Sequence, residues 1–66
     1  MGKNQHVTPH KDGGWQVKGE NNTRATIRTD TQAEAIQRAR EIARNQESEL
    51  FIHGRDGRIR ERDSFG

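Results

Sequence analysis

One segment of the sequence, residues 32–45, has the apolar spacing of an amphipathic helix, and the rest of the fold has to be built around it. Alanines and isoleucines recur there at helical intervals, with arginine and glutamate between them. Thr31 precedes the segment and Glu34 follows three residues later, which is the capping-box signature of a helix start. Polar residues end the pattern after position 45. The sequence therefore predicts a single helix from Gln32 to about Asn45.

Short runs that alternate apolar and polar side chains flank the helix on both sides, as half-buried strands do. Three runs precede the helix and two follow it, at residues 7–10, 15–18, 25–28, 50–53 and 58–61. A right-handed crossover through the helix would lay the fourth strand parallel to the first. The predicted fold class is α+β, with one helix packed on one face of a mainly antiparallel five-stranded sheet. The elements follow the order βββαββ, and the strands are expected in the spatial order 3-2-1-4-5.

Turn residues separate the predicted strands. Residues 11–14 and 20–22 are rich in glycine, aspartate and asparagine, and Asp56-Gly57 predicts a two-residue hairpin between the last two strands. Residues 1–66 are expected to form one small domain, with residues 1–4 and 63–66 frayed.

Apolar residues make up only 26% of the chain, and 33% of it is charged. A protein of this size buries only about 60% of the surface that its unfolded chain exposes. The absence of cysteine excludes disulfides and thiolate metal sites. No apolar run is long enough to span a membrane, and the N-terminus lacks the pattern of a signal peptide. We therefore expect a cytoplasmic protein.

The period-two rule divides the strand residues between two faces. The face expected to pack on the helix carries Val7, Trp15, Val17, Ala25, Ile27, Leu50, Ile52 and Ile59, opposite Ile36, Ala39, Ile42 and Ala43. The second face carries His6, Thr8, His10, Gln16, Lys18, Thr26, Arg28, Phe51, His53, Arg58 and Arg60. Because only one helix is predicted, we expect this second, open face to remain uncovered.

Two aromatic residues have alternative interpretations. Trp15 is interpreted as the main core anchor between sheet and helix, and a stacking role in binding is the alternative. Phe51 points away from the helix by alternation. It indicates either a dimer interface or a platform for stacking a nucleic-acid base, although single exposed aromatic residues also occur without a role.

The sequence does not contain the arrangements that common catalytic sites need. His6 and His10 flank Pro9 in an extended segment, where four residues span roughly 13 Å, too far for two ligands of one metal ion. No pattern places a histidine as base beside Ser48 or Ser64, and no glycine-rich phosphate loop is present. We therefore expect no enzyme activity, no cofactor, no metal and no small-molecule substrate.

Four motifs follow one another along the chain. They are His6-Val7-Thr8-Pro9-His10, Gly13-Gly14-Trp15-Gln16-Val17-Lys18, Thr31-Gln32-Ala33-Glu34-Ala35-Ile36 and Ile52-His53-Gly54-Arg55-Asp56-Gly57-Arg58-Ile59-Arg60. In this order they resemble a bacterial family, the domain of unknown function 2188 family. The resemblance implies a stand-alone small bacterial or phage-borne protein, and it implies no activity, substrate or site.

We expect a non-enzymatic binding module that acts through the open face, as a homodimer, on a protein or nucleic-acid target. The candidate binding surface is His6, His10, Lys18, Arg28, Phe51, His53, Arg55, Arg58 and Arg60. Twelve Lys/Arg against ten Asp/Glu is a small excess for a nucleic-acid-binding domain, which is the first alternative. The second alternative is a phage- or mobile-element-borne inhibitor of a host protein.

Overall fold

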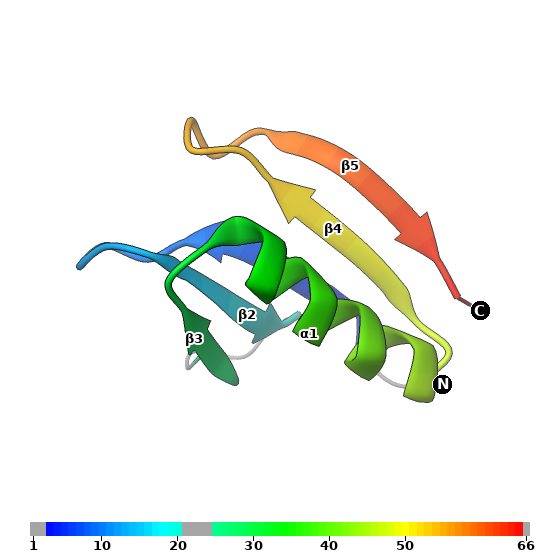
Figure 1. Cartoon of the computed structure of the whole chain (residues 1–66). Coiled ribbons are helices and arrows are strands. Elements are labelled where there is room, and N and C mark those ends of the chain that lie inside the picture. Colours follow the sequence, from blue (N-terminus) through cyan, green and yellow to red (C-terminus); the bar gives the residue numbers. More distant parts are fainter. Residues whose placement is uncertain (1–2, 21–24, 66) are drawn as a thin grey trace.

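The computed structural model describes residues 3–20 and 25–65, which form one helix against a five-stranded sheet (Figure 1). The elements are β1 (Gln5–Pro9), β2 (Trp15–Gly19), β3 (Ile27–Thr29), α1 (Gln32–Asn45), β4 (Glu49–His53) and β5 (Ile59–Ser64). The predicted α+β class and the order βββαββ are confirmed. The turn predicted at 20–22 lies largely outside the described residues.

The sheet has the strand order β3-β2-β1-β4-β5. β1 lies at its centre, antiparallel to β2 and parallel to β4, with Val7 opposite both Val17 and Ile52. The predicted parallel pairing of the first and fourth strands is therefore confirmed. It arises because α1 runs back across one face of the sheet and returns the chain to the start of β4 (Figure 1).

Local signals at both ends fix the bounds of α1. At the start, Thr31 has extended backbone angles and its side chain accepts a hydrogen bond of 3.2 Å from the Glu34 backbone N–H. At the end, the Ser48 N–H donates to the Ala43 carbonyl and the Glu47 N–H donates to the Arg44 carbonyl. Glu47 has a φ of 52°, so it occupies the left-handed position that usually holds glycine after a helix.

The core lies between α1 and the central strands. Ala35, Ala39 and Ala43 are completely buried, while Ile36 and Ile42 pack around them and are partly exposed. Alanine has no atoms beyond Cβ, so this row lets the helix approach the sheet closely. From the strands, the core receives Val7, Trp15, Val17, Leu50 and Ile52. The interpretation of Trp15 as a core anchor is confirmed, since its exposed fraction is 5%.

Ile59 was expected in the core, and this prediction is wrong because its side chain is 57% exposed. The pairing of β4 with β5 shifts between Ile52 and His53, so that Glu61 lies opposite Ile52 and Ile59 lies opposite His53. Arg60 is the extra residue, and it reverses the alternation that the sequence predicts. Ile59 consequently shares the open face with His53.

Two smaller predictions also need correction. Ala25 precedes β3 and is exposed, because β3 begins only at Ile27. The turn before β5 spans three residues, closed by a 2.7 Å hydrogen bond from the Gly54 N–H to the Arg58 carbonyl. Gly57 has a φ of 85°, whereas a two-residue turn of the predicted type would need positive φ at Asp56 as well.

The described parts of both termini are attached to the fold. β5 continues to Ser64, and the Phe65 N–H donates to the Ser48 carbonyl while its ring packs against the core, so residues 63–65 differ from the expected frayed end. Asn4 bonds to Glu20 and to the Glu49 N–H. Residues 1, 2 and 66 lie outside the described range.

In the part of the chain that the structure describes, no helix is long and apolar enough to cross a membrane.

Candidate functional site

The open face of the sheet is organised around a row of four side chains, one from each of four neighbouring strands. Lys18 of β2 lies opposite His6 of β1, His6 lies opposite Phe51 of β4, and Phe51 lies opposite Arg62 of β5. Lys18, His6 and Phe51 point away from α1, because Val17, Val7 and Ile52, their neighbours along the strands, are buried beneath the helix. Arg62 shares their face, because its neighbour Asp63 turns to α1 and lies 3.8 Å from Arg40.

His6 is the centre of this row and has three side-chain partners. Its ring stacks on Phe51, with 5.0 Å between ring centroids and 20° between the planes. Its Nδ1 lies 3.0 Å from Nε2 of His53, and its Nε2 lies 3.4 Å from Oε1 of Glu20. His53 in turn places its Nδ1 3.3 Å from the Gly57 carbonyl oxygen. These contacts fix both imidazole rings on the open face.

Ile59 extends this cluster to the edge strand, since it lies opposite His53 on β5. We call His6, Phe51, His53 and Ile59 together the open-face patch. Its three ring-bearing members are half-buried, and Ile59 is the large apolar side chain with the greatest exposure among the described residues. The patch combines flat rings with an exposed aliphatic group, a composition typical of the centre of an interface.

Charged side chains lie at both ends of the open face. At the end where β1 begins, Glu20 contacts His6, and Glu49 pairs with Arg62 at 3.5 Å. At the other end, Arg28 of β3 donates to the carbonyls of the β1–β2 turn, with 3.1 Å to the Gly13 oxygen. The end where β1 begins therefore carries the carboxylates of Glu20 and Glu49 together with the cations of Lys18 and Arg62. The other end carries Arg28.

The structure brings five of the nine predicted site residues together on this face: His6, Lys18, Arg28, Phe51 and His53. His10 lies at the far end of β1, where its Nδ1 accepts a hydrogen bond from the Asp12 N–H. Arg58 is highly exposed in the hairpin turn, with its Nε 4.0 Å from Asp56. Neither contacts the open-face patch in the described interactions.

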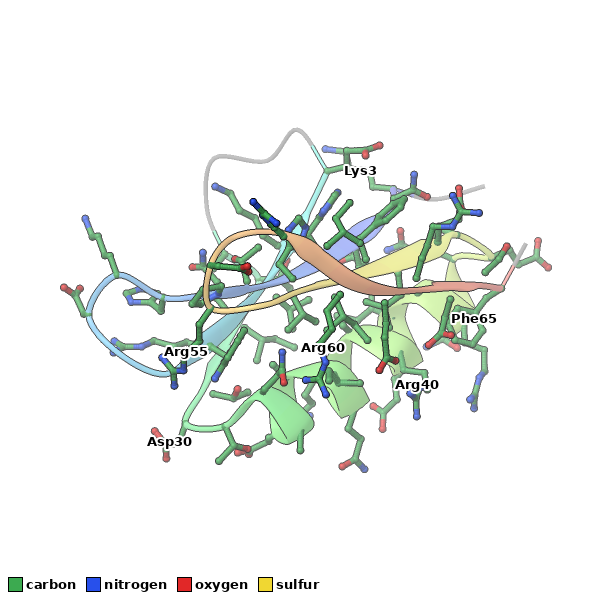
Figure 2. All side chains as sticks on the ribbon, turned by 90° about the horizontal axis from the view of Figure 1, so that it is seen from above. Lys3, Asp30, Arg40, Arg55, Arg60 and Phe65 are labelled. Atoms are coloured by element: carbon green, nitrogen blue, oxygen red, sulfur yellow. The ribbon has the colours of Figure 1, made fainter. Side chains whose placement is uncertain are left out.

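Arg55 and Arg60 were predicted on the open face or its rim, and this is wrong. The Arg55 guanidinium lies over the Trp15 ring, 5.2 Å from its centroid, and so covers the end of the core on the helix side. Arg60 reaches towards α1, as Figure 2 shows from above. It donates to the side-chain oxygen of Gln32 at 2.9 Å. The bulge in β5 turns Arg60 to this side, and the length of arginine allows both contacts.

Four charged or large apolar residues of the open face were not in the predicted site: Glu20, Glu49, Ile59 and Arg62. Strict alternation from Phe51 would have placed Glu49 on this face, so that signal was present in the sequence. Arg62 also follows by alternation from Arg58 and Arg60, which were expected on this face. Ile59 depends on the bulge, which has no local sequence signature. Within residues 3–20 and 25–65, no group of three His, Cys, Asp or Glu side chains could hold a metal ion.

Comparison with known proteins places this fold in a family. The family model described as an uncharacterized protein conserved in bacteria, DUF2188, matches residues 5–65. The chain belongs to the DUF2188 family. It is also similar to the uncharacterized protein YdaT of Bacillus subtilis (strain 168), with 41% identity over 66 residues. The alignment covers the whole of this DUF2188 chain and 43% of YdaT. No solved structure matches the chain.

Proposed function

We propose that this DUF2188 chain is a non-enzymatic binding module whose open sheet face associates with a second copy of itself. The observation that carries the proposal is the open-face patch, where Phe51 and an unusually exposed Ile59 lie on a sheet face that α1 does not cover. Apolar side chains grouped in this way on a surface mark interaction sites more often than isolated ones do.

The charges of the open face support a second copy as the occupant. A two-fold axis parallel to the sheet and across the strands would place the end with Glu20 and Glu49 over the end of the other copy that carries Arg28, so that carboxylates lie near a cation. An axis along the strands would place each end over the same end of the other copy, and would leave Arg28 away from these carboxylates. One symmetric arrangement of two copies is therefore complementary, as a closed dimer requires.

The alternative route to a dimer, through the outer edge of β5, is opposed by its charges. Two copies joined at this edge by a two-fold axis must pair residues that share a face. If the two-fold axis passes beside Arg62, Arg62 lies opposite Arg62 of the other copy, and Glu61 lies opposite Asp63. If the axis passes beside Glu61, Glu61 lies opposite Glu61 of the other copy. Like charges directly across a strand pair are destabilising, and charged edges are a common protection against pairing.

The area of the open face indicates how strongly two copies should associate. Five strands about 4.8 Å apart and about 17 Å long cover roughly 400 Å² in projection. Stable interfaces bury about 800 Å² per partner, so this dimer should be weak. Association should therefore be measured up to about 1 mM, where a binding free energy of about 4 kcal/mol is detectable.

Sedimentation equilibrium of the wild type, Phe51→Ser and Ile59→Asp tests the proposal. We expect the wild type to dimerise with rising concentration and both variants to remain monomeric. Ile59 is exposed, so Ile59→Asp should leave the fold intact, and circular dichroism checks this for each variant. Gln37→Asp, on the exposed side of α1, is the matched control and should associate like the wild type. A wild type that is monomeric over the whole range contradicts the proposal.

Nucleic acid is the other occupant to test. The positive side chains of the open face lie among acidic ones, and Arg62 is paired with Glu49, which disfavours a phosphate backbone as partner. Fluorescence anisotropy with a labelled duplex and a labelled single strand at low salt separates the two cases. Binding that weakens steeply with added salt would replace the dimer by a nucleic-acid target.

A further inference from the structure

We propose that His6 and His53 form a single proton-binding site. The two rings together carry three N–H hydrogens, one more than two neutral imidazole rings carry, and the additional proton is shared across the contact between the rings. The proposal concerns the isolated chain, and it stands or falls independently of the dimer. It follows from the three hydrogen-bond contacts that connect Gly57, His53, His6 and Glu20 in a line.

The contacts at both ends of this line need a donating ring nitrogen. Nδ1 of His53 faces the Gly57 carbonyl oxygen at 3.3 Å, and Nε2 of His6 faces the Glu20 carboxylate at 3.4 Å. A carbonyl oxygen and an ionised carboxylate can only accept a hydrogen bond. Each of these outer nitrogens must therefore carry a hydrogen for its contact to be a hydrogen bond.

The inner contact requires a third hydrogen. Nδ1 of His6 and Nε2 of His53 are 3.0 Å apart, a distance typical of a hydrogen bond. Two neutral rings supply two hydrogens, which leaves either two lone pairs facing each other or one outer contact unmade. Two fully protonated rings supply four hydrogens, which places two N–H groups against each other. Three hydrogens satisfy all three contacts, so the pair holds one positive charge.

The charged side chains around the pair balance one another. The residues that face it are Lys18 from β2, Glu20 directly after β2, Glu49 and Phe51 from β4, and Arg62 from β5. The two cations and two carboxylates among them balance, so one shared proton is the net charge of the cluster. The face of the Phe51 ring lies against His6, where it attracts a cation.

Nitrogen-15 NMR of the histidine rings between about pH 5 and 8, where histidine side chains change charge, tests the proposal. We expect His6 and His53 to respond together, in a first step in which the pair binds one proton and both rings shift. A second proton should enter in a separate step at lower pH, because it breaks the inner contact. His10 serves as the internal control, because its Nδ1 contacts the Asp12 backbone N–H at 3.0 Å and the Asp12 carboxylate at 4.0 Å, and no second histidine.

Substitutions make the test specific. His53→Gln should change the response of His6, and Glu20→Gln should change that of both rings, while the response of His10 stays the same. If either substitution prevents folding, the wild-type titration decides alone. The proposal is overturned if each ring binds its proton in one independent step, or if the response of His6 is the same with and without His53.

Discussion

Gly14 is the last residue of the turn into β2 and has a φ of +74°, and its backbone passes close to β3. A Cβ added there would lie 2.5 Å from the Thr29 carbonyl oxygen, a distance that no real Cβ adopts. Gly13, its neighbour, has a φ of +104°, but a Cβ there would have open space around it. Substitution of Gly13 therefore tests the cost of a side chain at positive φ alone, whereas substitution of Gly14 tests this cost together with the cost of close contact.

We therefore expect Gly14→Ala to lower the free energy of unfolding by well over 1 kcal/mol, because strain at positive φ and a backbone clash act together. Gly13→Ala should lose about 1 kcal/mol, since only the positive φ opposes it. Urea denaturation of both variants checks the difference. If both variants lose the same free energy of unfolding, the contact between the new Cβ and Thr29 costs nothing, and the expectation for Gly14→Ala is contradicted.

Residues of the candidate site were predictable where alternation and strand order decide their position. His6, Phe51 and His53 meet because β1 and β4 are parallel neighbours, which the crossover rule predicts. Arg55 and Arg60 were not predictable in this way. Their long side chains reach around the sheet to Trp15 and Gln32, and a contact of this kind depends on the final packing rather than on the period of the strand.

At the scale of elements, α1 was predicted with its observed bounds because its signals are local: a cap at Thr31 and a 3.6-residue period. The register of β5 was not predicted, because the bulge at Arg60 depends on how β5 pairs with β4. A single inserted residue moved Ile59 from the expected core to the open face. Edge strands have few packing constraints, so their register is the part that a sequence specifies least.

The end of α1 offers a stabilising change. Glu47 has a φ of 52°, which costs a residue with a side chain about 1–2 kcal/mol. Glu47→Gly should raise the free energy of unfolding by about 0.5–1 kcal/mol, after allowing for the greater entropy of glycine in the unfolded chain. Thermal or urea denaturation measures the gain. Gln46→Gly is the control, because Gln46 has a φ of −95° and should only lose stability.

At the scale of the molecule, charge complementarity of the open face predicts how association responds to charge reversal. Arg28→Glu should weaken dimerisation roughly tenfold, about 1.4 kcal/mol, because each copy loses an attraction and gains a repulsion. Arg38→Glu makes the same change in net charge on the exposed side of α1. It should leave association unchanged in sedimentation equilibrium. Equal effects of both substitutions would mean that net charge, not the open face, controls association.

The parallel pairing of β1 with β4 also has a consequence for folding kinetics. β1 pairs with β2 and β2 with β3, and β5 pairs with β4, all between segments close in sequence. The contact between β1 and β4 closes a loop of more than forty residues, which is slow because of its entropy. The seam between the two halves should therefore form last. His6 lies on one side of this seam, with Phe51 and His53 on the other, so their ring signals would report the moment at which the halves join.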